Sequence, residues 1–310
     1  MNTHKNDDTC SPRAMIEKYG IHVIPGVLSP DQATYYRNKL TDYVNQVNPQ
    51  VSHGVIQHYE IGHQQFMWDL RCEPTLLNAF ADLWNCSTES LLCSFDGANY
   101  IPAPESTKRP RYRHHEKPWL HVDQGSKYQG LHTIQGMVAL SKMSPDDATF
   151  CYLEKSHLGF EKLMTELSDT LPNNKLRRNY HKVPPHMYDT LGPLRHISLN
   201  PGDLLLWDSR LVHANARAVQ GRTDPCDRAA AYVCMKPHKD ATEKQLSRKR
   251  KAFSELRTTS HDPIEFTLNG KNPQVWGNKN KLAVYTDAVR RYSVTPHEPS
   301  TKILRLAGYL

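Results

Sequence analysis

The chain has 310 residues, 39 of them basic and 32 acidic, which gives a net charge of +7. Hydrophobic residues make up 38% of it, which is consistent with a buried core. The 7 cysteines are scattered and form no Cys-x-x-Cys motif. This pattern argues against a disulfide framework or a zinc ribbon and favours a reducing compartment.

Membrane and export signals are not visible in the sequence. The N-terminal residues are polar, and no apolar run approaches the roughly 18 residues of a spanning helix. No internal repeat or low-complexity linker divides the chain. We therefore expect a cytoplasmic protein with no membrane span and a single domain over residues 1–310. Its core would cover about residues 18–235, with a basic C-terminal extension, residues 236–310, packed on it.

Two helices are predicted in the first third of the chain. At the first one, Ser29 can cap the backbone, Pro30 suits the first helical position and Gln32 completes a capping box. The apolar face that follows consists of Tyr36, Leu40, Val44 and Val47. The second helix is expected over residues 73–84, with a packing face of Leu76, Leu77, Phe80 and Trp84. Both faces are interpreted as core.

Strands dominate the middle of the chain. Residues 91–100 are predicted to be a strand, and so are residues 133–140, where apolar side chains alternate. After a turn at 201–203, residues 204–207 are predicted to be a buried strand. The residues between 158 and 200 are rich in charge and proline. They are either a lid or substrate wall, or a surface loop. With the helices mostly outside, the layout is α+β with a mainly β core.

The candidate metal ligands are His121 and Asp123, in the triplet His-Val-Asp, and His213, just beyond the strand at 204–207. Two imidazoles and one carboxylate at this kind of separation are typical of the facial ligand set of non-haem Fe(II) oxygenases, which leaves three metal positions open. Neutral imidazoles and an ionised carboxylate are the forms that bind the metal.

Other histidines have weaker claims. A second triplet, His238-Lys-Asp240, lies beside a charged segment with no flanking strand, so we interpret it as a solvated loop. His53, His58 and His63 recur every five residues, a spacing that fits neither one helix face nor one strand face. We expect these three to be surface or core residues.

The chain resembles the phytanoyl-CoA dioxygenase-like family of Fe(II)- and 2-oxoglutarate-dependent oxygenases, over about residues 18–235. The resembling stretches are residues 19–29, 119–123, 135–136, 156–157 and 202–215, together with Arg228. The resemblance implies a double-stranded β-helix, which is a cupin-like jelly roll, with flanking helices. It also implies that the enzyme uses Fe(II), O2 and 2-oxoglutarate, hydroxylates its substrate and releases succinate and CO2.

A 2-oxoglutarate bound at such a site needs a cation for its distal carboxylate, and arginine suits it because the planar fork meets a carboxylate bidentately. Arg217, Arg222 and Arg228 all follow His213. Arg228 opens a predicted core strand over residues 228–235, and its position is similar to that of the family's anchor, so we favour it. Gln135 and Asn215 are either co-substrate or substrate contacts, or ordinary polar groups of strands.

The substrate is an unidentified small or carrier-bound molecule. Residues 108–115 are basic and precede the metal triplet, so they either border the mouth and attract an anionic substrate or form a solvated loop. Residues 244–251, on a predicted helix, are either a phosphate-contacting face or a solvated one. Nucleic acid is therefore a less favoured partner, and the alternative function is a non-catalytic nucleic-acid or protein-binding module on the same scaffold. We assign no function to residues 257–262.

Overall fold

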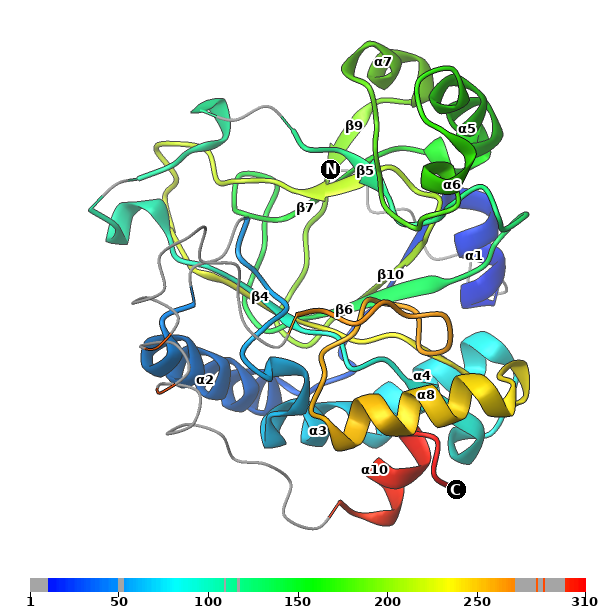
Figure 1. The fold of residues 1–310 in the computed structure, drawn as a ribbon. Helices are drawn as coiled ribbons and strands as arrows, with labels where there is room; N and C mark the ends of the chain where they lie inside the picture. The colour runs from blue at the N-terminus through cyan, green and yellow to red at the C-terminus, as the bar shows by residue number, and fades with distance from the viewer. Residues whose placement is uncertain are drawn as a thin grey trace.

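Two antiparallel sheets face each other at the centre of the molecule, and helices cover their outer sides (Figure 1). This computed structural model describes residues 11–49, 53–108, 110–115, 118–270, 283, 287 and 299–310. No ladder joins the two sheets within these residues, so the core is not a closed barrel. The predicted jelly-roll core with flanking helices is confirmed.

The larger sheet has six strands, in the order β1 (Ile21–Ile24), β10 (Leu204–Asp208), β6 (Ile134–Ala139), β12 (Arg228–Tyr232), β4 (Ala98–Ile101) and β2 (Val55–Ile56). The smaller sheet has five, in the order β8 (His181–Lys182), β5 (His121–Val122), β11 (His213–Asn215), β7 (Phe150–Leu153) and β9 (Leu194–His196). A separate pair consists of β13 (Met235–Pro237) and β3 (Leu91–Cys93). Between the two main sheets, the rings of Phe150 and Trp207 pack 4.9 Å apart.

Helices cover both outer faces. The larger sheet packs its outer side chains against α2 (Pro30–Val47), α3 (Gln65–Arg71), α4 (Pro74–Trp84), α8 (Glu243–Ser254) and α10 (Thr301–Leu306). The smaller sheet packs against α5 (Phe160–Ser168), α6 (Asn173–Leu176) and α7 (Tyr188–Leu191). Helix α1 (Pro12–Tyr19) lies against β1 and β10. Short 3-10 helices lie at η1 (Ile61–His63), η2 (Thr88–Ser90), η3 (Pro104–Ser106), η4 (Arg113–His115), η5 (Ser156–Gly159), η6 (Pro185–Met187) and η7 (His238–Asp240).

The two predicted N-terminal helices are confirmed. Ser29 Oγ accepts a hydrogen bond from the Gln32 amide while Gln32 Oε1 accepts one from the Ser29 amide, which completes the capping box of α2. The packing face of α4 buries Leu76, Leu77 and Phe80 against the larger sheet. The predicted strand over residues 133–140 is confirmed as β6, and the basic helix as α8.

Two expected strands are broken in the structure. Residues 91–100 divide into β3 and β4, which lie in different sheets. At the break, Asp96 Oδ1 accepts a hydrogen bond from the Gly97 amide at 2.7 Å, so a local side chain replaces a ladder partner. Residues 228–235 also divide, between β12 and β13, and the region 158–200 is a helical cover that also supplies β8 and β9 rather than one long loop.

Among the residues described here, no helix is both long and apolar enough to span a bilayer.

Candidate metal centre

The three predicted metal ligands come together in the smaller sheet. His121 on β5 lies directly opposite His213 on β11, and Asp123 follows β5. One ligand atom from each of the three residues lies within 4.8 Å of the other two. Both histidines are nearly buried, with 5% of their surface exposed. A metal ion could therefore bind here with three protein ligands on one side.

Backbone contacts orient the two imidazole rings. Nδ1 of His121 lies 3.2 Å from the Trp119 carbonyl oxygen, and Nδ1 of His213 lies 2.9 Å from that of Leu211. A proton on each Nδ1 leaves Nε2 free, and both Nε2 atoms face Asp123 Oδ2, at 3.7 and 3.4 Å. Burial and the neighbouring His213 lower the pKa of His121 to about 3, which keeps this ring neutral.

The carboxylate of Asp123 is held in its charged form. Burial alone would raise its pKa, but the histidines around it, His121, His213 and His261, hold the pKa well below its usual value. Gln135 on β6 donates from Nε2 to Asp123 Oδ2 at 3.1 Å. Neutral imidazoles and an ionised carboxylate form the donor set that Fe(II) takes in non-haem oxygenases.

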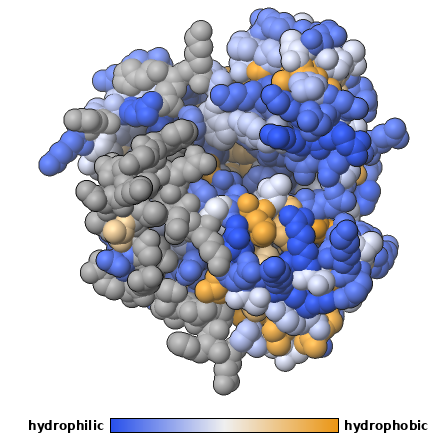
Figure 2. All heavy atoms as spheres, in the orientation of Figure 1, coloured by the Kyte–Doolittle hydropathy of each residue, from blue (hydrophilic) through white to orange (hydrophobic). Residues whose placement is uncertain are grey.

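A cavity of about 1100 Å³ opens over these ligands. In Figure 2 this face is hollowed between the part that carries α5, α6 and α7 and the part that carries α8, with mostly hydrophilic residues around the hollow. Six Phe, Trp and Tyr side chains line the cavity: Trp119, Phe150, Tyr180, Trp207, Tyr232 and Phe266. Tyr180, from the region 158–200, lies with its ring 5.0 Å from that of His121. This region therefore does form a wall of the cavity.

The other two predicted polar contacts also line this cavity. The Oε1 atom of Gln135 is buried and has no hydrogen-bond partner among the described residues. Asn215 donates from Nδ2 to the hydroxyl of Tyr232 at 3.2 Å. Gln135 therefore has an unused acceptor beside the ligand group, whereas Asn215 already has a partner.

The three candidate arginines differ in their surroundings. Arg228 is 1% exposed, and its Nε and Nη1 atoms have no hydrogen-bond partner among the described residues. Its Nη2 lies 3.2 Å from the sulfur of Met137, and it shares a face of β12 with Tyr232. Arg222 instead pairs with Glu105 at 2.6 Å and with Asp147 at 2.5 Å. Arg217 does not line the cavity. Of the three, only Arg228 has buried donors without a hydrogen-bond partner among the described residues. Like Arg217 it is not itself a lining residue of the cavity, but Tyr232 on the same face of β12 is.

Of the two alternatives for the basic segment at 108–115, the structure does not support a border of the cavity mouth. None of its described residues lines the cavity. Arg113 donates instead to the backbone carbonyls of Pro145 and Arg217, at 2.7 and 2.8 Å. The cavity takes its cations from elsewhere: Lys127, Arg177, Arg178, Lys182 and Arg248. The sequence left open a phosphate-contacting face that includes Arg248 and a substrate wall in the region of Arg177, Arg178 and Lys182, but only the fold brings these residues together with Lys127.

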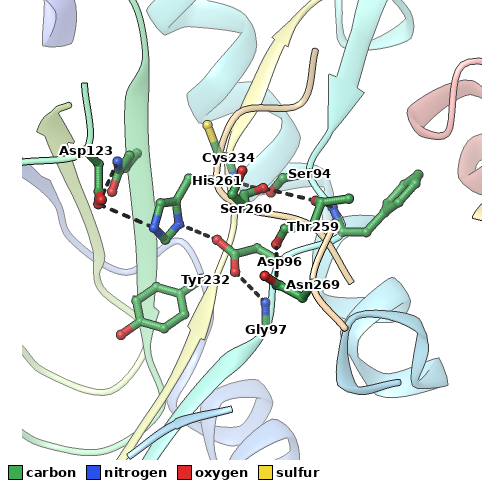
Figure 3. Close-up of polar contacts among 12 residues, drawn as sticks. Ser94, Asp96, Gly97, Asp123, Tyr232, Cys234, Thr259, Ser260, His261 and Asn269 are labelled. Atoms are coloured by element: carbon green, nitrogen blue, oxygen red, sulfur yellow. Dashed lines mark hydrogen bonds and ion pairs between the residues drawn. The ribbon is translucent and has the colours of Figure 1, made fainter. Parts of the chain in front are cut away.

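Sequence reasoning also missed His261. Its Nε2 lies 3.4 Å from Asp123 Oδ2, and its Nδ1 forms an ion pair with Asp96 Oδ2 (Figure 3). Burial opposes the charge on this ring, but the two carboxylates outweigh it and hold its pKa well above the usual value. Three other histidines can be compared with their expected places. His63 is a core residue, as expected, with its Nε2 on the Arg257 carbonyl, and His238 lies in η7 outside the ligand group. His53, expected at the surface or in the core, lines the cavity.

A jelly-roll core with two histidines and one carboxylate beside a cavity defines a class of proteins, the mononuclear non-haem iron oxygenases. The chain belongs to the phytanoyl-CoA dioxygenase (PhyH) family, whose model matches residues 16–219. It is therefore a 2-oxoglutarate-dependent oxygenase that uses Fe(II), 2-oxoglutarate and O2. This membership favours the enzyme over the alternative of a non-catalytic binding module.

Known proteins resemble the chain over most of its length. Ava biosynthesis cluster protein O of Aspergillus versicolor is 28% identical over 275 residues, which cover 81% of this chain and 85% of that protein. The structure of hypothetical protein JW0805 from Escherichia coli is similar with a TM-score of 0.55 and 16% identity, over 90% of this chain and 81% of that one. EctD from S. alaskensis with bound Fe has a TM-score of 0.50 and 14% identity, over 78% and 82%. These two structures support the fold alone.

Proposed function

We propose that His121, Asp123 and His213 hold Fe(II), that Arg228 binds the distal carboxylate of 2-oxoglutarate, and that the enzyme hydroxylates an anionic small or carrier-bound molecule. The observation that carries this proposal is the ligand group on a cavity wall, together with a buried arginine that has free donors and shares its face of β12 with Tyr232 of that wall. The bound iron and co-substrate would supply the oxidising chemistry, with succinate and CO2 as co-products.

Each protein group has a separate task in this proposal. The carbonyls of Trp119 and Leu211 fix the imidazole tautomers, so that the free Nε2 atoms face the metal position. Gln135 fixes the carboxylate of Asp123 by its hydrogen bond. Arg228 offers two unpaired donors, and a carboxylate that reached them would displace the weak contact with the Met137 sulfur.

The charge of the cavity wall supports an anionic substrate. Of its carboxylates, Glu265 pairs with Lys127 at 2.8 Å and Asp262 pairs with Lys236 at 2.7 Å, while Asp123 belongs to the ligand group. The remaining wall cations make no salt bridge with any described residue: Arg177, Arg178, Lys182 and Arg248. With the wall acids neutralised, the field at the mouth is positive and attracts an anion.

An anaerobic titration with Fe(II) and then 2-oxoglutarate tests the proposed centre. Bidentate chelation of the iron by 2-oxoglutarate is expected to produce a weak visible charge-transfer band. The band should be absent in His213→Gln and present in His181→Gln. His181 is a buried histidine on β8 whose Nε2 contacts the backbone carbonyls of Leu176 and Arg178. Failure of the wild-type protein to develop the band, or its survival in folded His213→Gln, would contradict the proposed ligands.

A further inference from the structure

His261 stands between two carboxylates at the edge of the proposed iron site. Its Nε2 faces Asp123 Oδ2 at 3.4 Å, and its Nδ1 is paired with Asp96. Each ring nitrogen therefore has a carboxylate oxygen to which it can donate a hydrogen bond. The ring is not part of the ligand group formed by His121, Asp123 and His213. It contacts the carboxylate from outside that group.

The far end of this chain of contacts is rigidly held. Asp96 is 1% exposed, and its Oδ1 accepts a hydrogen bond from the Gly97 amide (Figure 3). The carbonyl oxygen of Asp96 accepts a hydrogen bond from Nη2 of Arg71 at 2.7 Å, and Arg71, the last residue of α3, is itself buried. A carboxylate fixed in this way can orient the histidine that donates to it.

The segment that carries His261 is also tied down. We call residues 257–262 the strap. Thr259 donates from its amide to the Phe95 carbonyl at 3.0 Å, and its hydroxyl oxygen accepts from the Phe95 amide at 3.0 Å. At the end of the strap, Asp262 accepts hydrogen bonds from Lys236 and Thr133, both at 2.7 Å. The strap therefore holds the His261 ring against the segment between β3 and β4 that carries Asp96.

We propose that His261, held by Asp96, is a positioning residue that fixes the carboxylate of Asp123 for metal binding. This inference rests on the proposed function. Gln135 and His261 both contact Asp123 Oδ2, so the two donors together restrict rotation of the carboxylate. The family match ends at residue 219, so the positioning contact comes from a part of the chain outside that match. Loss of a side chain that orients a metal ligand typically weakens metal affinity by about 10–100-fold, so loss of His261 should weaken it by about 10-fold or more.

Binding of Co(II) alone, without 2-oxoglutarate or turnover, tests this role. His261→Leu removes both donors, whereas His261→Gln retains an amide donor for Asp123. We expect the dissociation constant for Co(II) to rise about 10-fold or more in His261→Leu, with a changed visible absorption spectrum, and less in His261→Gln. Asp96→Asn should raise it in the same direction, because the ring loses its fixed partner.

His63→Gln is the matched control, since His63 is a buried histidine that contacts the same strap through the Arg257 carbonyl but lies outside the ligand group. It should bind Co(II) with wild-type affinity and spectrum. The role is refuted if folded His261→Leu and His261→Gln match the wild type, or if His63→Gln weakens binding as much as His261→Leu does. If the wild type itself binds no Co(II), the proposed metal centre is wrong and this inference fails with it. If the wild type binds Co(II) and the His261 variants bind it with wild-type affinity, the metal centre stands but His261 does not position Asp123.

Discussion

Replacement of Arg228 by methionine separates function from stability in this protein. The guanidinium is buried, and two of its nitrogens have no hydrogen-bond partner among the described residues. Burial lowers the pKa of Arg228 because the charged form has lost its solvation. In the protein without co-substrate, this charge is therefore a cost to folding. In the complex that we propose, the same charge is neutralised by the distal carboxylate of 2-oxoglutarate.

The expected magnitudes follow from these contacts. Two charge-assisted hydrogen bonds at about 1.5–3 kcal/mol each amount to roughly 3–6 kcal/mol. Since about 1.4 kcal/mol corresponds to a factor of ten, the dissociation constant for 2-oxoglutarate should rise at least ~100-fold in Arg228→Met. Replacement of buried ionic groups by apolar side chains of similar volume is often stabilising by about 1–4 kcal/mol, so the free energy of unfolding without ligands should stay level or rise.

Arg222→Met is the matched control, because Arg222 already pairs with Glu105 and Asp147. Its removal leaves two carboxylates without a cation, so it should lower the free energy of unfolding while the 2-oxoglutarate affinity changes little. Urea unfolding of the ligand-free proteins and anaerobic 2-oxoglutarate titrations of the Fe(II) proteins measure the two quantities. If Arg228→Met binds 2-oxoglutarate normally, Arg228 is not the anchor; if it also unfolds more easily than Arg222→Met, the reasoning from an unpaired buried charge is wrong.

Two further predictions concern the cavity wall and the core. We expect carboxylic acids to stimulate 2-oxoglutarate turnover by the wild type more than their matched neutral esters do. The double substitution Arg177→Glu and Arg248→Glu should remove that preference. A wild-type preference for the esters would contradict the anionic substrate. Burial lowers the pKa of Lys249 to about 7, so the unfolded chain binds more protons than the folded one from there up to about pH 10. The stability from this difference is fully present above about pH 10 and is lost as the pH falls to 7. Measured by urea unfolding, the free energy of unfolding of the wild type minus that of Lys249→Met should therefore rise with pH across that window. A difference that does not change with pH would refute the lowered pKa of Lys249.

Local patterns in the sequence were sufficient for part of this structure. The capping box at Ser29 and the alternation along β6 depend only on neighbouring residues, and both are present. The sequence context of His121 and His213 also led to the ligand group, because the His121 triplet precedes the alternating run at 133–140 and His213 follows the apolar strand at 204–207. The preference for Arg228 over Arg222 depended on its place at the start of a core strand, and the structure gives Arg228 the free donors.

Long-range contacts account for what the sequence could not reveal. At the break between β3 and β4, Gly97 approaches Ile56 so closely that a Cβ atom would lie 1.8 Å from the Ile56 carbonyl oxygen. No local sequence pattern around Gly97 or Ile56 predicts this contact. His261 likewise has no local pattern around it, because its two partners, Asp96 and Asp123, lie far away in the chain. The cations of the cavity wall come from several separate elements in the same way.

Helix α8 lies after the family match and takes part in both proposals through two neighbouring residues. Lys249 faces inward, where its ammonium donates to the carbonyls of Cys93 and Pro263. Its neighbour Arg248 faces the cavity, with its guanidinium 4.6 Å from the ring of Phe266. Since Cys93 ends the strand just before the segment that carries Asp96, one helix contacts the support of His261 and also supplies a cation to the cavity wall. In the function that we propose, displacement of α8 would therefore disturb metal binding and substrate charge selection together, although the three proposed metal ligands lie elsewhere.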